Sequence, residues 1–286
     1  AGRLRRDIDG GRTTFGAMAT AVNRRLNETT ELSFLRSGAY TGGVDFRTET
    51  ESRVWSVFGS LSGSHIRGSA AAIAAAQRAS ARYFQRPDAD HLEFDPDATA
   101  LSGYRFQVDA GKRAGTWIWN LGLTATSPGY EINDIGFQLN SDRILVDPNV
   151  TYEQNQPGAL FRRWSLRFGP DFDFNTGGDL IRFIPMLTYN YQLLNYWSGT
   201  LRYNYLGTVL SDRLTRGGPL ARLPRGTARR VVGPSVPSLD WWSACRRRGF
   251  GGGRRRQGAA CRSRLEERTW PTDRSTSAPQ CRSGPL

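Results

Sequence analysis

Apolar and polar residues alternate with a period of two along most of residues 12–208, and this pattern constrains the fold more than any other feature of the sequence. In FRRWSLRFGPDFDFN, residues 161–175, apolar side chains occupy every second position, and charged or small residues fill most positions between them. One side chain on the same face at every second residue is the periodicity of a β-strand. About eight or nine such runs occur, and most are longer than the ~5–6 residues of an ordinary strand. The sequence therefore predicts an all-β chain of long strands.

Short and long connections alternate between the predicted strands. Long loops alternating with short turns are typical of an outer-membrane β-barrel, whose short turns lie on the periplasmic side. One connection, Asn175–Asp179, is short where this pattern expects a long loop. The short turns are expected near 49–52, 111–114, 155–158 and 193–195, and the long loops at 24–37, 66–98, 127–141 and from 208 onward.

One segment is predicted to be helical. SAAAIAAAQRASARYF, residues 69–84, is rich in alanine, the strongest helix former, and begins with a serine that can cap the first turn. It is too short to cross a bilayer, which takes about 20 apolar residues. We expect a short Ala-rich helix carried by a long loop.

The two faces of the predicted strands differ in charge. Alternation alone fits both a water-soluble sandwich and a membrane barrel, but strand length, aromatic residues near strand ends and one face with charges of both signs favour the barrel. A charge facing lipid near the midplane costs about 2–4 kcal/mol, so the charged face is expected to line a wet lumen, where opposite charges pair across strands. We predict an antiparallel up-and-down transmembrane-type β-barrel, present in part. Lumen-facing candidates are Arg105, Asp109, Arg163, Arg167, Asp171, Asp173 and Arg202, and lipid-facing candidates are Trp117, Trp119, Trp164, Phe168, Phe172 and Tyr203.

The C-terminal segment differs from the rest of the chain in composition. Residues 224–286 lack strand and helix periodicity, and from 225 onward they hold 14 arginines against four carboxylates, so most of the net charge of +13 lies there. All three cysteines, at 245, 261 and 281, also lie there, with spacing that matches neither a zinc module nor a disulfide framework. We interpret 1–223 as a partial barrel domain and 224–286 as a disordered tail or a frameshifted, out-of-frame segment.

The arginine-rich segment raises the question of a nucleic-acid partner. RRRGFGGGRRR resembles an arginine–glycine RNA-binding element, but it occurs once and outside the predicted strands, so nucleic acid is not expected as a partner. No signal peptide is visible and the chain begins AGRLRRD, which we interpret as a fragment.

No catalytic constellation is recognisable, so the sequence leaves enzyme activity open and favours its absence. His65 and His91 lack metal-ligand spacing, no serine lies in a G-x-S-x-G context, and Asp171 with Asp173 sits among arginines rather than forming a glycosidase pair. No cofactor and no metal site are expected.

One acidic run is a weak candidate for a calcium site. The carboxylates lie within QRPDADHLEFDPDA, but the glycine and the terminal glutamate of a calcium loop are missing, so a solvated acidic loop is the preferred interpretation. The candidate ligands in this run are Asp88, Asp90, Asp95 and Asp97.

Several blocks of the sequence resemble a bacterial family of uncharacterised domains found downstream of a family 9-like carbohydrate-binding module. The resemblance covers about residues 3–223 and implies an outer-membrane-type β-barrel in a cell-envelope protein, with no catalytic residues to carry over. In that family DRLTRGGP is followed by further alternating strands, whereas here it runs into the arginine-rich segment. The blocks are GGRTTFGAMATAVNRRL, LRSGAYTGGVDFR, GSHIRGSAAAI, RYFQRPDADH, SPGYEINDIGFQLNSDR, NYWSG and DRLTRGGPL.

These observations lead to one principal hypothesis and two alternatives. The principal hypothesis is an integral β-barrel domain in the outer membrane of a Gram-negative-type bacterium, in contact with lipid and associated with carbohydrate binding or uptake. The alternatives are a soluble envelope β-sheet module that binds carbohydrate through its aromatic residues, and a glycan hydrolase. Nothing in the sequence specifies an oligomeric state.

Overall fold

The computed structural model describes residues 1–26, 32 and 34–235. The chain divides into two units, Ala1–Pro237 and Ser238–Leu286, and the described residues all lie in the first unit. Within those residues no helix combines the length and the apolar character needed to cross a membrane.

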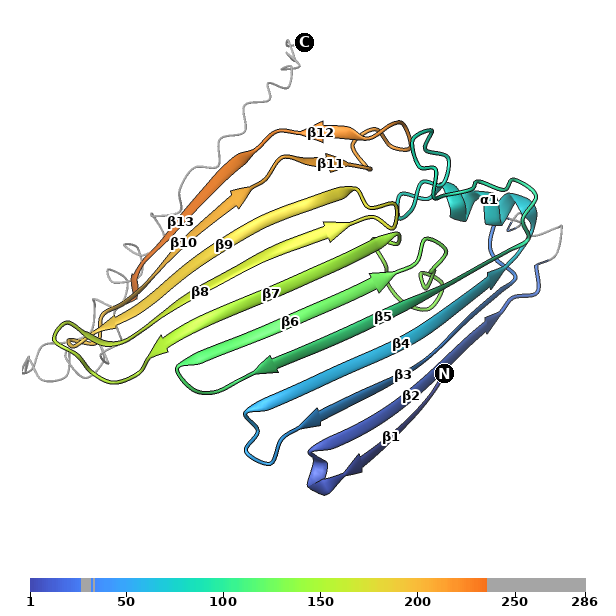
Figure 1. Ribbon diagram of the computed structural model, residues 1–286. Coiled ribbons are helices and arrows are strands. Elements are labelled where there is room, and N and C mark those ends of the chain that lie inside the picture. Colours follow the sequence, from blue (N-terminus) through green and yellow to red (C-terminus); the bar gives the residue numbers. More distant parts are fainter. Residues whose placement is uncertain (27–31, 33, 236–286) are drawn as a thin grey trace, which may run out of the picture. The chain divides into compact units, whose positions relative to one another are not determined.

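Ten consecutive strands form one antiparallel meander, in which each strand pairs with the next along the chain, and an eleventh strand, β13, pairs with β10 (Figure 1). The mostly β fold and the up-and-down strand order are as predicted. The strands are β1 (Gly2–Ile8), β2 (Thr13–Asn23), β3 (Gly38–Glu49), β4 (Trp55–Arg67), β5 (Ala100–Lys112), β6 (Trp117–Thr126), β7 (Arg143–Gln154), β8 (Phe161–Phe174), β9 (Leu180–Leu193), β10 (Ser198–Leu206) and β13 (Gly226–Ser235).

The sheet is open rather than closed into a barrel. Within the described residues β1 pairs only with β2, and β13 pairs only with β10, so these two strands are edges. Closure would require backbone pairing between two such edges, or between them and further strands. The described residues therefore form an open antiparallel sheet, and its place in a barrel stays a prediction.

Turns and loops segregate to opposite ends of the sheet, as predicted. The connections β3–β4, β5–β6, β7–β8 and β9–β10 are short turns at one end, which we call the turn end (Figure 1). The connections β2–β3, β4–β5 and β6–β7 are long loops at the other end, which we call the loop end.

The segment that was expected to be a tail begins with a strand. After β10, the short strands β11 (Val209–Ser211) and β12 (Ala221–Leu223) pair with each other, and β13 then returns alongside β10. Residues 226–235 therefore extend the sheet, and the predicted boundary at 223 falls before its last strand. Residues 236–286, which hold the rest of the expected tail, lie outside the described residues.

The predicted helix forms but is shorter than expected. α1 spans Ala70–Arg78, and the Ser69 hydroxyl accepts a hydrogen bond from the Ala72 N–H at 3.2 Å, which caps the first turn. Ala79 has an extended conformation, with ψ of 152°, which ends the helix before the predicted Phe84. A single 3-10 turn, η1 (Asp9–Gly11), joins β1 to β2.

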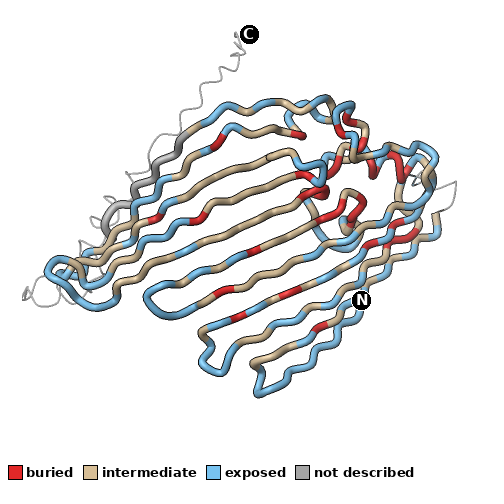
Figure 2. The backbone as a smooth tube through the Cα atoms, viewed as in Figure 1, coloured by how far each residue is buried: buried red, intermediate tan, exposed pale blue. Residues whose placement is uncertain are grey.

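Buried residues gather at the loop end, and most of the sheet is a single layer (Figure 2). The apolar core contains Ala39 and Ile66, which are directly opposite each other on β3 and β4, together with Ile73 and Ala76 of α1. Ala39 and Ile66 share the face of Asp45 by strand parity. The helix therefore packs on the charged side of the sheet.

Candidate functional site

The strand register separates the side chains of the sheet into two chemically different faces. Phe172 pairs with Val146 on one side and Phe183 on the other, whereas Asp173 pairs with Leu145 and Arg182. Because successive residues of a strand point to opposite faces, this register defines an apolar face, which carries Phe172, and a polar face, which carries Asp173.

Both predicted sets of residues follow this division. By register and parity, Trp117, Trp119, Trp164, Phe168, Phe172 and Tyr203 lie on the apolar face. By the same criterion, Arg105, Asp109, Arg163, Arg167, Asp171, Asp173 and Arg202 lie on the polar face. That the first set contacts lipid and the second lumen water stays a prediction.

Many large hydrophobic side chains on the apolar face are exposed, and others, such as Trp164 and Phe172, are half-buried. Among the strand residues described, only two exposed large hydrophobic side chains, Met18 and Leu206, lie on the polar face. The exposed residues of the apolar face are Leu4, Ile8, Phe15, Val44, Phe46, Trp55, Val57, Leu61, Tyr104, Phe106, Trp117, Trp119, Leu121, Val150, Leu166, Phe168, Leu187, Leu201 and Tyr203.

Aromatic rings form a continuous chain of contacts across the turn end of the apolar face. The ring centroids of Trp117 and Tyr152 are 5.0 Å apart, and those of Tyr152 and Trp164 are 5.2 Å apart. Tyr189 continues the chain at 6.0 Å from Trp164, and Tyr191 follows at 5.8 Å from Tyr189. These separations fall in the range of favourable aromatic pairs.

Buried ion pairs fasten the loops over the polar face at the loop end. The first group centres on Glu131, whose carboxylate lies 2.5 Å from Arg82 and 3.3 Å from Arg36. Arg36 also pairs with Asp134 at 3.0 Å, and Arg24 does so at 2.7 Å. These residues come from the β2–β3, β4–β5 and β6–β7 loops, so the group joins three connections that are far apart in sequence.

The environment of Glu131 keeps its carboxylate charged. Burial alone would raise the pKa of Glu131, but the ion pair and hydrogen bond with Arg82 outweigh it and hold the pKa below its ordinary value of 4.5. The Arg82 guanidinium also donates to the carbonyls of Ala76, Pro128 and Tyr130. Each nitrogen of the Arg82 guanidinium thus donates a hydrogen bond within the protein, so we assign the ion-pair group around Glu131 a structural role.

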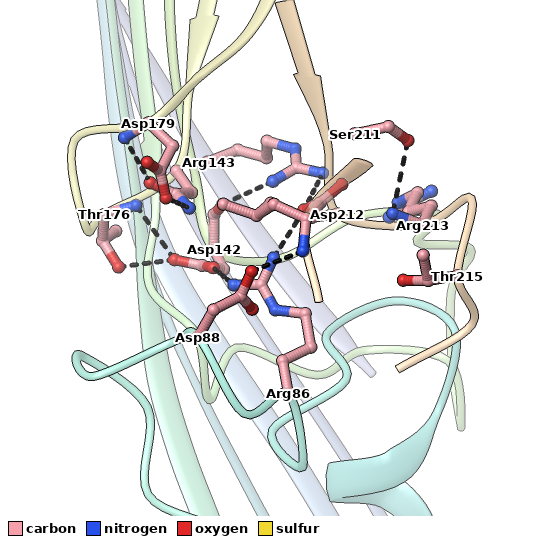
Figure 3. Close-up of polar contacts among 12 residues, drawn as sticks. Arg86, Asp88, Asp142, Arg143, Thr176, Asp179, Ser211, Asp212, Arg213 and Thr215 are labelled. Atoms are coloured by element: carbon pink, nitrogen blue, oxygen red, sulfur yellow. Dashed lines mark hydrogen bonds and ion pairs between the residues drawn. The ribbon is translucent and has the colours of Figure 1, made fainter. Parts of the chain in front are cut away.

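A second buried group joins the β4–β5 loop to the start of β7 and to the segment after β11 (Figure 3). Arg86 lies 3.7 Å from both Asp142 and Asp212. Arg143 lies 2.6 Å from Asp212 and 3.7 Å from Asp173. We call these five residues the loop-end cluster.

Two neighbours of Asp142 have the residue types of a catalytic triad but not its geometry. Thr176 donates both its backbone N–H, at 3.0 Å, and its hydroxyl, at 2.5 Å, to the Asp142 carboxylate, and His91 Nε2 lies 3.1 Å from the same carboxylate. The hydroxyl therefore bonds to the acid rather than to the imidazole, unlike the nucleophile of a catalytic triad, which bonds to the histidine. A Cβ atom at Gly177 would lie 2.4 Å from His91 Nδ1, so backbone fills the other side of the ring.

The short connection between β8 and β9 is closed by its own side chains. Asn175 donates to the Asp179 carboxylate at 2.8 Å, and the Asp179 N–H donates back to the Asn175 side-chain oxygen at 2.8 Å. Gly178 has a φ of 91°, a left-handed conformation that favours glycine. This reciprocal pair replaces the long loop that alternation led us to expect.

Three of the four weak calcium candidates in the acidic run take part in hydrogen bonds with other residues of the chain. Asp95 exchanges backbone hydrogen bonds with the Gln77 side chain, and its carboxylate accepts the Asp97 N–H at 2.9 Å. The Asp88 carboxylate accepts the Leu220 N–H, and Asp90 is exposed. Among the described residues no group of three or more His, Cys, Asp or Glu side chains is placed to hold a metal ion.

The charges of the polar face pair only in part. Asp171 lies 3.9 Å from Arg182 on the neighbouring strand, as expected for cross-strand pairing. Arg163, Arg167 and Arg202, by contrast, have no carboxylate within 4.0 Å among the residues that the structure describes. All three are exposed, so this face carries accessible guanidinium groups from the turn end, at Arg163, to the middle of the strands, at Arg167 and Arg202.

Comparison with known proteins assigns a family to this sheet. The family described as "Domain of unknown function (DUF5916)" matches residues 36–206. The chain belongs to this family. The DUF5916 match contains β3 to β10, helix α1 and the β6–β7 loop, whereas β1, β2 and β13 lie outside it. No curated protein and no solved structure matches the chain. The family description mentions neither a barrel nor a carbohydrate-binding module, so both stay predictions.

Proposed function

We propose that this DUF5916 chain forms part of the wall of an outer-membrane β-barrel, with its apolar face against lipid and its polar face toward a water-filled interior. The observation that carries the proposal is the exposed apolar face, which extends over β1 to β10. Monomeric soluble proteins rarely expose contiguous apolar patches larger than a few hundred Å². A bilayer is the environment that removes such a face from water without a second protein layer.

The cost of exposing apolar side chains to water and the cost of placing a charge in lipid favour the same orientation of the sheet. Burying a large apolar side chain is worth about 1.5–3 kcal/mol relative to leaving it in water, and Phe168, Leu187 and Tyr203 lie side by side without such burial. An arginine facing lipid near the midplane costs about 2–4 kcal/mol, so Arg167, next to Phe168, must face water. Because the register puts Phe168 and Arg167 on opposite faces, a single orientation of the sheet keeps the apolar side chain out of water and the arginine out of lipid.

Strand dimensions fit a bilayer. From Trp164 to Phe174, β8 rises roughly 33 Å at ~3.3 Å per residue, and a tilt of ~40° reduces this to about 25 Å, the height of the apolar band of outer-membrane barrels. Rings cluster at both ends of this span, with Trp164 beside Tyr152 at the turn end and Phe172 stacked 5.0 Å from Phe183 toward the loop end. Aromatic girdles at both interfaces are typical of such barrels.

The open edges place a condition on the proposal. Unpaired backbone groups of β1 and β13 would each cost several kcal/mol in hydrocarbon. The proposal therefore requires that both edges be paired in the membrane, with each other or with further strands.

Membrane assembly of the full chain tests the proposal. We expect the chain, refolded in the presence of phosphatidylethanolamine and phosphatidylglycerol vesicles, to float with them and to resist extraction by urea. An unheated sample should migrate differently from a boiled one on a denaturing gel, because a folded transmembrane sheet resists the detergent. A monodisperse protein that stays in solution without detergent, and does not float, would favour the soluble carbohydrate-binding alternative instead.

A further inference from the structure

A groove of about 340 Å³ lies on the turn end of the sheet, across β7 to β10. Its lining combines one carboxylate and one guanidinium with neutral hydrogen-bonding groups from three neighbouring strands. The polar side chains that matter for its chemistry are Glu153, Arg163, Ser165, Asn190, Gln192 and Thr200.

The neutral groups form a row in direct register. Ser165 of β8 pairs with Asn190 of β9, which pairs with Thr200 of β10. The Asn190 side-chain N–H donates to the Ser165 hydroxyl at 3.3 Å, and the Thr200 hydroxyl donates to the Asn190 oxygen at 2.8 Å. An asparagine amide has two N–H donors and two acceptor lone pairs, so half of its capacity is left for a ligand.

Arginines lie on both sides of this row. Arg163 lies one register step toward the turns, opposite Gln192. Arg167 and Arg202 lie one step toward the loops, each directly opposite Thr188. One step on the same face is about 7 Å, so the row of neutral groups runs between Arg163 on one side and Arg167 and Arg202 on the other.

These arginines differ from Arg143 and Arg182 on the same face because they are exposed and have no carboxylate within 4.0 Å among the described residues. Arg143 and Arg182 each lie within 4.0 Å of a carboxylate, as do Arg36 and Arg82 in the loops. Glu153 is the one acidic residue that lines the groove, and it accepts a hydrogen bond from Asn155 at 3.2 Å. Positive charge therefore exceeds negative charge in and beside the groove.

We propose that this groove binds an oligosaccharide that carries carboxylates, of the uronic-acid class. Guanidinium groups bind carboxylates through paired, charge-assisted hydrogen bonds, and Arg163 on one side with Arg167 and Arg202 on the other would hold successive carboxylates of the chain. Asn190, Gln192 and Thr200 would bind the sugar hydroxyls between them. The arginines are spread over an area larger than one phosphate group, which favours an extended polyanion. This inference rests on the proposed function, because the polar face must line water for a saccharide to reach the groove.

Calorimetric titration of the full chain in vesicles with tetragalacturonate tests this assignment, with maltotetraose as the neutral ligand of equal length. We expect binding of the acidic oligomer, weakened about tenfold by Arg167→Gln and again by Arg202→Gln, since each variant removes one charge-assisted contact. Arg47→Gln is the matched control: it makes the same change on the polar face of β3, where Arg47 already pairs with Glu49 at 2.7 Å, and should leave the affinity unchanged. Binding should also weaken as salt is raised.

Each of the following results would overturn the assignment. Equal affinity for maltotetraose would show that charge does not select the ligand, and full competition by equimolar inorganic phosphate would show a site for anions in general. Unchanged binding in the Arg167→Gln, Arg202→Gln double variant would place the ligand elsewhere. Vesicle flotation of the same sample separates this inference from the proposed function: a chain that floats but does not bind the uronide refutes the groove alone. A chain that does not float refutes the membrane proposal, and titration in solution then judges the groove by itself.

Discussion

Arginines at the loop end and arginines on the rest of the polar face have opposite environments. At the loop end, Arg82 and Arg86 are buried and each lies within 4.0 Å of a carboxylate, whereas Arg163, Arg167 and Arg202, between the turn end and the middle of the strands, are exposed and have no carboxylate within 4.0 Å among the described residues. A buried charge must be paired because removing it from water costs several kcal/mol, but an exposed one needs no partner. The loop end is thus a fixed structure that holds long loops over the sheet, and the polar face from the turn end to mid-strand is a surface with charge to offer a ligand.

Breaking the Arg82–Glu131 pair should have the largest effect on the loop end. Glu131→Leu leaves the Arg82 guanidinium buried without its carboxylate, and loss of one partner of a buried pair costs about 3–5 kcal/mol. Unfolding in increasing concentrations of guanidinium chloride, followed by circular dichroism, measures the change in the free energy of unfolding. Glu51→Leu is the control, because the Glu51 side chain is 93% exposed and its contact with Arg12 is 4.0 Å long. Equal effects of the two substitutions would refute the distinction between fixed and free charges.

The contrast between the two faces predicts the next largest effect. Phe168→Arg places a charge on the apolar face at the middle of β8, and we expect it to reduce vesicle insertion by about 2–4 kcal/mol. Ser165→Arg adds the same side chain to the polar face of the same strand and should insert normally. Vesicle flotation against urea concentration measures both, and equal loss of insertion would contradict the assignment of faces.

Acid should weaken the loop end through Glu131. The pKa of Glu131 in the folded chain lies below the ordinary 4.5, so its contribution to stability is fully present above about pH 4.5 and is lost as the pH falls below that value. We therefore expect the stability difference between the wild type and Glu131→Gln to be largest near pH 6 and to shrink toward pH 3. A difference that is constant over this range would show that the Glu131 charge contributes nothing.

The helix cap should have the smallest effect. Ser69→Ala removes the acceptor of the Ala72 N–H and should cost about 1 kcal/mol of loop-end stability, while Ser69→Asp keeps an acceptor and should cost less. Hydrogen exchange of the α1 amides compares the two variants. Identical exchange in both would mean that packing of α1 against Ile66, rather than the cap, fixes the start of the helix.

The strands, turns and two faces of the sheet could be predicted because they depend on local periodicity. Trp164, Leu166 and Phe168 share a face in any extended conformation, whatever lies beside them. The end of α1 was placed too late because the alanine-rich composition continues beyond Arg78, whereas Ala79 leaves the helix where the chain turns back on itself. β13 was missed because adjacent Arg229 and Arg230 and adjacent Val231 and Val232 break the alternation. This strand is specified by pairing with β10 rather than by its own pattern.

The loop-end ion pairs could not be predicted because their partners lie far apart in the sequence. Arg82 is 49 residues from Glu131, and Arg86 meets Asp212 only once the β4–β5 loop and the segment after β11 are folded. One signal was present, since the blocks RYFQRPDADH, SPGYEINDIGFQLNSDR and DRLTRGGPL, which carry the family resemblance, contain or adjoin these loop residues rather than lie within strands. Charged, non-periodic blocks in long loops therefore marked the fixed part of the molecule.

The most direct test of the account is the environment of five consecutive residues, 164–168, in vesicles. The cysteines at 245, 261 and 281 can be replaced by serine, and single cysteines introduced at each of the five positions can then carry a nitroxide spin label. We predict that collisions with oxygen, which concentrates in lipid, peak at Trp164, Leu166 and Phe168, and that collisions with a water-soluble nickel chelate peak at Ser165 and Arg167. Chelate access at all five positions, or access without a period of two, would contradict the claim that this sheet separates lipid from water.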